Sequence, residues 1–372
     1  MKVSDIVMPK HEKKNPFRPT FGSIPVSIAG REDIMLDILD GLRNKPGDPN
    51  RSCIFSGPRG TGKTVLLTAI ANIAESEGWI SVNVTSGQDM LKEILLQVKE
   101  KASHILTPAA KARISGLSIG GVGFSVTYKE EPTSWRIEMT RILEELEHNE
   151  TGLLITVDEI SSHQEELKIL IDNYQHFIRE NRNIALLMAG LPQQVSTLLQ
   201  EDRISFLRRA FLHEMGMIPV DDVAQAIRET IEEGGRRIED KALWNAAEKT
   251  GGFAFLIQLL GYHMWRQSPE NEEITSIDVE RAYEVARRQM ERTIFEVTSR
   301  ELTGREHEFL SKMTEDDEES RVSIIAKRME ISANNATKIK RRLLDQGLIR
   351  ETGRGRVAID VPLLKEYLIN KS

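Results

Sequence analysis

A glycine-rich octapeptide constrains this chain more than any other feature of its sequence. It follows a short apolar run, Cys53-Ile54-Phe55, and fits the pattern GxxxxGK[ST]. A strand, a glycine-rich loop and a helix in this order form a binding site for phosphate. The backbone N–H groups of the loop and the positive end of the helix dipole converge on the anion. A surface loop that fits by chance is the alternative, and the preceding apolar run disfavours it. The predicted phosphate-binding residues are Gly57, Pro58, Arg59, Gly60, Thr61, Gly62, Lys63 and Thr64.

The last two residues of the octapeptide have distinct expected roles. Lys63 is expected to reach the β- and γ-phosphates of a nucleotide, and the Thr64 hydroxyl to bind Mg²⁺. Mg²⁺ takes hard oxygen ligands and is usually held by few protein groups together with phosphate and water. We therefore expect ATP or GTP with Mg²⁺ as the cofactors.

A second apolar run, residues 153–157, ends in two adjacent carboxylates, Asp158 and Glu159. Such a run predicts a central parallel strand, and ligands bind at the carboxyl ends of these strands. Asp158 is then expected to hold Mg²⁺ through water, and Glu159 to polarise the attacking water as general base. The alternative is a strand followed by a solvated acidic turn, which the upstream octapeptide disfavours. Together the two motifs predict an ATPase.

The composition limits the class of protein. The 372 residues are 40% apolar and 29% charged, which is enough material for two or three domains. The formal charge of −7 argues against a protein that coats nucleic acid or anionic membrane over its whole surface. The single cysteine, Cys53, excludes an intrachain disulfide and a cysteine-rich zinc site. Because no apolar run approaches membrane-spanning length and no signal peptide is recognisable, we expect a cytoplasmic protein without membrane contact.

Periodicity divides the first 300 residues into three segments. Residues 1–20 contain three prolines and are expected to form an extended arm. Residues 21–218 alternate strand and helix patterns, which is typical of a parallel sheet. Within them, residues 115–130 indicate an inserted β-hairpin, with a flexible glycine-rich loop as the alternative. Residues 219–300 are predicted to be helical, with helices near 220–233, 239–250, 253–267 and 275–300.

The C-terminal segment, residues 301–372, has a different pattern. An acidic run, residues 315–319, is expected to be a solvated linker or loop. Two helices follow, joined by a turn at Ile331–Asn334, and then two strands around Gly353-Arg354-Gly355. Helix, turn, helix and β-wing in this order resemble a winged helix-turn-helix domain.

The positive charge of the chain is concentrated in this segment. From Glu319 to Asp360 there are ten Lys or Arg against five Asp or Glu, a net charge of +5. A basic winged helix can place its second helix in the major groove of duplex DNA and its wing on the backbone. A winged helix that contacts protein or caps a core is the alternative, and Lys340 or Arg342 is expected to be structural. The predicted DNA contacts are Asn335, Thr337, Lys338, Arg341, Arg350, Arg354 and Arg356.

Two adjacent arginines, Arg208 and Arg209, precede a short apolar strand predicted at residues 211–217. A guanidinium supplied by a neighbouring subunit stabilises transition-state charge on a γ-phosphate. Arg209 is the better candidate because it lies closer to the strand, and it implies a homo-oligomer. The alternative is that both arginines decorate the end of an amphipathic helix.

These motifs, in this order, resemble those of the AAA+ ATPases, and more closely the branch of origin-recognition and replication-licensing ATPases with their prokaryotic relatives. The resemblance covers about residues 17–300 and is strongest at the two phosphate motifs. It implies an α/β fold: a P-loop parallel-sheet AAA+ domain at 21–218, a helical lid at 219–300 and a winged helix-turn-helix domain at 301–372. It also implies that Ile24, Val26 and Ile28 supply apolar contacts to adenine.

The sequence departs from this family in two places. The apolar strand that ends at Gly190 lacks the polar residue expected at its tip, unless Gln193 or Gln194 replaces it. The segment Gly251-Gly252-Phe253-Ala254-Phe255 lacks the arginine with which many relatives contact the γ-phosphate from the lid. Both departures predict slow hydrolysis.

Three functions are compatible with this sequence. The main hypothesis is an ATP-hydrolysing AAA+ protein whose winged helix binds duplex DNA under the control of nucleotide state. The second is a slow signalling switch whose winged helix contacts protein, which the resemblance of the lid to that of the signalling ATPases with numerous domains favours. The third is an inactive nucleotide-binding scaffold, which the two departures favour.

Overall fold

The computed structural model describes residues 13–20, 22–106, 135–292, 302–361 and 363–371. The hairpin predicted at 115–130 lies outside them. The chain forms two compact units. One unit contains residues 33–57 and 63–215; the other contains residues 1–32, 58–62 and 216–372. Within the described ranges, none of the helices is long and apolar enough to cross a membrane.

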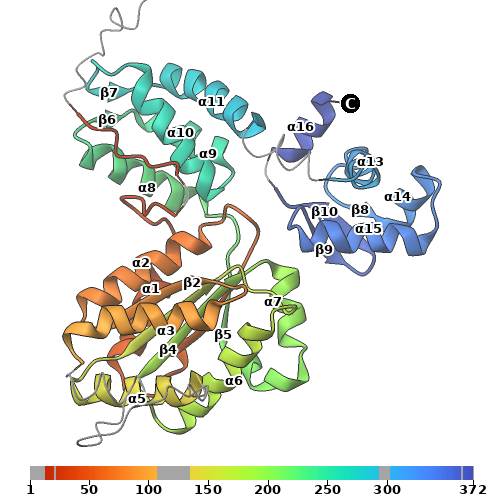
Figure 1. Ribbon diagram of the computed structural model, residues 1–372. Coiled ribbons are helices and arrows are strands. Elements are labelled where there is room, and N and C mark those ends of the chain that lie inside the picture. The colour runs from red at the N-terminus through yellow and green to blue at the C-terminus, as the bar shows by residue number, and fades with distance from the viewer. Residues whose placement is uncertain (1–12, 21, 107–134, 293–301, 362, 372) are drawn as a thin grey trace, which may run out of the picture. The chain divides into compact units, whose positions relative to one another are not determined.

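A five-stranded parallel sheet forms the centre of the first unit (Figure 1). Its strands pair in the order β2-β3-β4-β1-β5, so sequence neighbours β1 and β2 are separated by two other strands. This is the parallel α/β sheet that the sequence predicts. The strands are β1 (Ser52–Ser56), β2 (Ile80–Thr85), β3 (Leu153–Asp158), β4 (Ile184–Gly190) and β5 (Phe211–Glu214).

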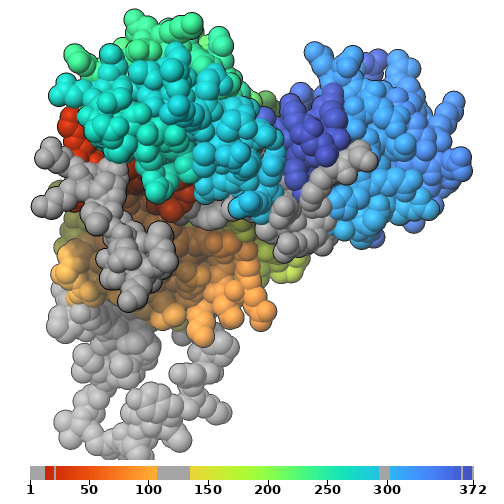
Figure 2. Space-filling model, turned by 90° about the horizontal axis from the view of Figure 1, so that it is seen from above, coloured from red at the N-terminus to blue at the C-terminus, as the bar shows by residue number. Residues whose placement is uncertain are grey.

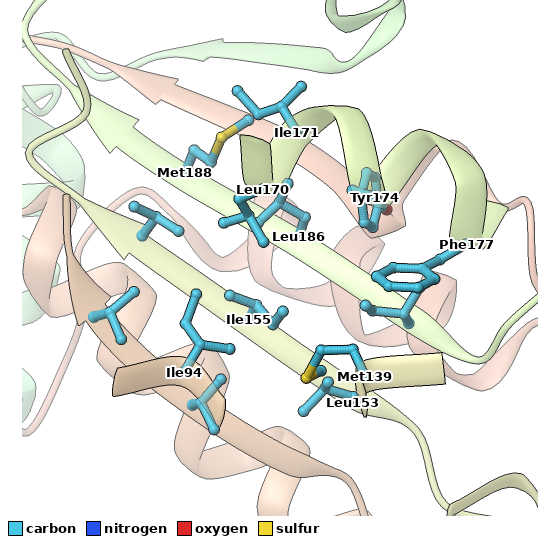
Figure 3. Packing of buried hydrophobic residues seen from close by; sticks show 14 of the residues in the cluster. Ile94, Met139, Leu153, Ile155, Leu170, Ile171, Tyr174, Phe177, Leu186 and Met188 are labelled. Carbon is cyan, nitrogen blue, oxygen red and sulfur yellow. The ribbon is translucent and has the colours of Figure 1, made fainter. Parts of the chain in front are cut away.

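Helices cover both faces of this sheet, because its central strands are apolar on both sides. Along β4, Leu186 and Met188 belong to one core and Leu187 to the other. The first core lies against α3, α5 and α6 (Figure 3), and the second against α1 and α2. The helices are α1 (Glu32–Arg43), α2 (Lys63–Ser76), α3 (Met90–Lys101), α5 (Trp135–His148), α6 (Glu165–Arg179) and α7 (Pro192–Leu199), with 3-10 turns η2 (Pro49–Arg51), η3 (Ala102–His104) and η4 (Asp202–Arg209).

Four helices form the lid in the second unit, as one closely packed body coloured green to cyan in Figure 2. The first three begin and end within one residue of the predicted bounds, and the fourth is described to Met290. A two-residue parallel ladder between β6 and β7 was not predicted. The elements are α8 (Val220–Glu233), β6 (Arg237–Ile238), α9 (Asp240–Thr250), α10 (Ala254–Gln267), β7 (Glu273–Ile274) and α11 (Ser276–Met290).

The described part of the N-terminal arm, residues 13–20, is extended but anchored on the lid. Phe17 is 3% exposed and lies so close to α10 that a Cβ added to Gly261 would be 2.2 Å from its ring. The side-chain amide of Asn15 donates to the carbonyl of Tyr262 at 3.0 Å. The ring of Phe17 therefore ties the arm to the core of the lid. The proline spacing of this segment predicted an extended arm but not this anchor.

The C-terminal domain has the winged-helix order of elements, with an antiparallel sheet β8-β10-β9. Ser332 caps its second helix by accepting a hydrogen bond from the Asn335 N–H at 3.3 Å. Helices α13 and α16 and strand β8 were not predicted. The elements are α13 (Gly304–Met313), β8 (Ser320–Arg321), α14 (Val322–Arg328), α15 (Ala333–Asp345), β9 (Ile349–Gly353), β10 (Arg356–Ile359) and α16 (Leu364–Lys371).

The acidic run 315–319 is a loop, which is one of the two predicted alternatives, and Glu315, Asp317 and Glu318 are exposed in it, but Asp316 and Glu319 are paired with basic side chains. Both carboxylate oxygens of Asp316 accept hydrogen bonds from the guanidinium of Arg328, at 2.7 Å each. Glu319 accepts a hydrogen bond from the Thr352 hydroxyl at 2.8 Å and pairs with Arg356. Asp316 therefore ties the acidic loop to α14, and Glu319 ties it to the two strands of the wing.

The Asp316–Arg328 pair predicts a pH-dependent contribution to stability. Hydrogen bonding to Arg328 lowers the pKa of Asp316, so the stabilisation is present at neutral pH and is lost as the pH falls below about 4. Asp316→Asn is expected to lower the free energy of unfolding by about 1 kcal/mol at pH 7, and by less toward pH 3. Urea unfolding of the full chain measures this.

Asp317→Asn is the matched control, because the adjacent Asp317 side chain is exposed. It is expected to leave the free energy of unfolding unchanged. Equal losses in the two variants at pH 7 would contradict the role given to the ion pair.

Candidate functional site

The glycine-rich octapeptide forms the loop between β1 and α2, and α2 begins at Lys63. Gly60 and Gly62 have φ of 78° and 89°, in the left-handed region that favours glycine. The Lys63 ammonium donates to the carbonyl of Gly57 at 2.7 Å. The Thr61 hydroxyl donates to the Pro58 carbonyl at 2.9 Å. Gly60 and Gly62 thus adopt a conformation that other residues rarely take, and the contact of this loop with phosphate stays a prediction.

The two residues predicted to bind Mg²⁺ are brought into direct contact. The Thr64 hydroxyl donates to Oδ2 of Asp158, which ends β3. Two oxygen groups side by side fit Mg²⁺, which would take phosphate and water oxygens for its other ligands. The part of the chain that the structure describes has no cluster of three or more His, Cys, Asp or Glu able to hold a metal by itself.

Glu159, the predicted general base, is exposed immediately beyond the end of β3. Its backbone N–H donates to Oδ1 of Asp158 at 2.8 Å, and its φ of 54° is unusual for a residue other than glycine. This bond and this backbone conformation orient the chain where it leaves the strand. Backbone strain of this kind is common at functional sites.

The missing polar residue at the tip of β4 has a steric cause. A Cβ added to Gly190 would lie 2.7 Å from Cγ1 of Ile160, which is 1% exposed. Of the two predicted substitutes, Gln194 accepts a hydrogen bond at its Oε1 from the Ser161 hydroxyl at 3.1 Å, two residues beyond Glu159. Sequence reasoning missed Ile160, since a glycine signals a close neighbour without identifying it.

The predicted adenine contacts, Ile24, Val26 and Ile28, are each half-buried in the second unit. The lid holds this segment at several points. The Ser27 hydroxyl donates to Glu229 at 2.8 Å, and a Cβ added to Gly30 would be 2.7 Å from a carboxylate oxygen of Asp222. The three side chains are each partly exposed, and their contact with adenine stays a prediction.

The two arginines before β5 differ in their contacts. Arg208 donates to the Leu199 carbonyl at 2.8 Å. Arg209 is exposed, with no hydrogen bond or ion pair to any residue that the structure describes. Arg209 is therefore the one whose guanidinium is available to another molecule.

The predicted DNA contacts divide into two groups. Two wing arginines are ion-paired: Arg350 with Asp360 at 3.2 Å, and Arg356 with Glu319. Lys340 pairs with Glu351 at 2.5 Å, as expected of a structural residue. The remaining predicted contacts are exposed, on α15 and at the wing tip: Asn335, Thr337, Lys338, Arg341 and Arg354.

Comparisons with known proteins support the fold. The model described as Domain of unknown function (DUF8462) matches residues 292–368, and no curated protein matches the chain. A Walker-type ATPase of Pyrococcus abyssi is similar with a TM-score of 0.61 at 16% identity, covering 92% of this chain and 96% of that one. Cdc6p from Pyrobaculum aerophilum is similar with a TM-score of 0.50 at 15% identity. The ORC2 protein of Aeropyrum pernix, in its ADP form, is similar with a TM-score of 0.52 at 13% identity. Both likenesses cover 95% of this chain and 96% of the protein compared.

These likenesses extend over nearly the whole chain and show its fold. It is the P-loop AAA+ fold of Cdc6/Orc-like ATPases, with the small antiparallel sheet of a winged helix at its C-terminus. The fold class and the resemblance predicted from the sequence are confirmed.

The contact between Gly190 and Ile160 generates a prediction about stability. Gly190→Ser is expected to lower the free energy of unfolding by about 1–3 kcal/mol, because the new side chain overlaps Ile160. Ile160→Ala in the same chain is expected to relieve part of that loss, so the double variant is more stable than additivity requires. Thermal unfolding of the three variants measures this.

Gly216→Ser is the matched control, since a Cβ at Gly216 meets no atom within 4 Å. It is expected to be nearly neutral. Additive effects of Gly190→Ser and Ile160→Ala would show that the two sites do not compete for space.

Proposed function

We propose that this protein binds ATP with Mg²⁺, hydrolyses it slowly, and uses nucleotide state to control how its winged helix binds duplex DNA. The observation that carries the proposal is the contact between Thr64 and Asp158, with Glu159 exposed beside them. Three groups with separate roles in phosphoryl transfer meet at the carboxyl edge of the sheet.

Each side chain of the site has a specific role in this proposal. Lys63 exchanges its present acceptor, the Gly57 carbonyl, for β- and γ-phosphate oxygens. Thr64 would bind Mg²⁺ directly and Asp158 would hold it through water, and the ion would neutralise phosphate charge. Glu159 orients and deprotonates the attacking water. Arg209 reaches the nucleotide of a neighbouring copy, so the site is complete in a homo-oligomer.

Slow turnover follows from what surrounds these groups. Ile160 occupies the space into which a polar residue at position 190 would extend. One donor to the attacking water or γ-phosphate is then missing, and a single such donor is worth about 10²–10³ in rate. The same reasoning favours an ATPase that works as a switch over one that works as a continuous motor.

The DNA-binding part of the proposal rests on exposed cations of the winged helix. Lys338 and Arg341 lie three residues apart on α15, so they share one helical face, and Arg354 is at the wing tip. None of the three has an ion pair with any described residue. Such cations are free to replace the counterions of a phosphate backbone.

One observation favours the second candidate function, a signalling switch whose winged helix contacts protein. Arg350 and Arg356 are already neutralised by Asp360 and Glu319. When the whole acidic run is counted, residues 315–360 carry ten basic against nine acidic side chains, a net charge of only +1. A weakly charged wing suits a protein partner better than a phosphate backbone.

The ATPase assignment predicts the behaviour of two variants. Glu159→Gln is expected to bind ATP normally but to lower turnover about 10²–10⁴-fold, because the general base is lost. Lys63→Ala is expected to lose ATP binding. A fluorescent ATP analogue measures binding, and phosphate release measures turnover.

Glu150→Gln is the matched control for Glu159→Gln, because Glu150 is also exposed and has a φ of 55°. Its turnover is expected to equal that of the unsubstituted protein. Normal turnover in Glu159→Gln would remove Glu159 from the mechanism, and normal ATP binding in Lys63→Ala would remove the phosphate role of Lys63.

The DNA assignment predicts a salt-dependent effect. The triple variant Lys338→Ala, Arg341→Ala, Arg354→Ala is expected to weaken duplex binding and to reduce the slope of log affinity against log salt by about 2–3, since each phosphate contact contributes about 0.9. Gel shifts over a salt series measure this.

A charge-matched control replaces three other exposed cations, Lys45, Lys241 and Arg281, by alanine. This control is expected to leave the salt slope unchanged. If the unsubstituted protein binds no duplex at low salt with or without ATP, the DNA assignment fails and the signalling switch replaces it.

A further inference from the structure

Phe253, at the start of α10, packs against the tip of the phosphate-binding loop within the second unit. The ring is 2% exposed, and a Cβ added to Gly60 would lie 2.2 Å from its Cζ atom. The backbone N–H of Phe255 donates to the carbonyl of Gly60 at 3.3 Å. Gly60 is therefore held by a ring contact and by a backbone hydrogen bond from the same turn of the lid.

A tight turn fixes the position of this ring. Gly251 and Gly252 have φ of 56° and 74°, and a Cβ added to Gly252 would be 2.2 Å from the carbonyl oxygen of Ile218. The carbonyl of Gly252 accepts a hydrogen bond from the Ile218 N–H at 2.9 Å. Because Ile218 holds this turn both by close contact and by a hydrogen bond, the ring of Phe253 has little freedom to move away from the loop independently.

The same ring belongs to a core that extends into the winged-helix domain. Phe253 clusters with Leu256 of α10, Met290 of α11 and Phe309 of α13. Tyr367 of α16 is also in this cluster. Contiguous apolar packing thus leads from Gly60 to the domain proposed to bind DNA.

We propose that Phe253 is the nucleotide sensor of the lid, and that it acts by packing, where many relatives use a charged arginine. This inference rests on the proposed function. Phosphate binding draws the loop backbone around the nucleotide, and Gly60 cannot move without changing the surface on which the ring rests. Packed cores respond to such a change by moving between discrete arrangements, so the shift passes through the shared cluster to the winged helix.

Amide hydrogen exchange of the full chain, with and without ATP and Mg²⁺, tests the sensor. In the unsubstituted protein ATP is expected to slow exchange in the loop 57–64, and to change exchange in α10 and α13 about fivefold or more, the lower range of ordinary coupling between sites. In Phe253→Ala the loop is still expected to respond, and the response of α10 and α13 is expected to disappear. Phe253→Leu keeps most of the apolar volume without the ring, and the same loss is expected there.

Phe309→Ala is the matched control, because Phe309 is fully buried in the same cluster but is not among the residues in contact with Gly60. In this variant α10 is still expected to respond to ATP. An ATP response of α10 and α13 in Phe253→Ala and Phe253→Leu equal to that of the unsubstituted protein would overturn the sensor alone. Absence of any response in loop 57–64 of the unsubstituted protein would overturn the nucleotide function, and the sensor with it.

Discussion

The parallel pairing of β1, β3 and β4 is the constraint on which the candidate site depends. These strands are buried on both faces, so side chains that must meet a polar ligand can emerge only where the strands end. Ser56 pairs with Gly190, and Val157 pairs with Met188, so the three strands end close together at one edge. That register brings Asp158 to Thr64, and a shift of one residue would exchange the two apolar cores and separate the pair.

Two close contacts at glycines lie where this site lacks the polar residue at the tip of β4 and the arginine of the lid. At the tip of β4, Gly190 leaves room for Ile160; at the tip of the loop, Gly60 leaves room for Phe253. In both places an apolar side chain lies where the family resemblance implies a polar or charged one. Salt screens a contact between exposed charges but hardly affects apolar packing. In the proposed sensor, a shift of Gly60 therefore reaches the winged helix through apolar packing around Phe253, and it depends on how closely the side chains of that core fit.

Charge in the winged-helix domain shows how far a sequence count can mislead. The basic residues after Glu319 suggest a strongly positive surface, but the fold pairs several of them with acids of the run at 315–319, with Glu351 of β9 and with Asp360. Lys338, Arg341 and Arg354 remain exposed. The resulting surface is a small cationic patch on a nearly neutral domain. In the proposed complex with DNA, the phosphate contacts therefore come from α15 and the wing tip, since Arg350 and Arg356 are already ion-paired.

The sequence by itself determined the elements whose signals are local. The glycine-rich pattern located the loop at 57–64, where Gly60 and Gly62 have positive φ. Apolar periodicity placed the first three lid helices within one residue, whereas the strand predicted at 211–217 ends three residues earlier, at Glu214. Only the tertiary structure decided which residues from distant parts of the chain meet. Ile160, Phe253 and the partners of the acidic run carry no local signal, because their roles arise from packing between segments that periodicity cannot pair. Local propensity depends on a few neighbouring residues, whereas shape complementarity and ion pairing depend on the whole fold.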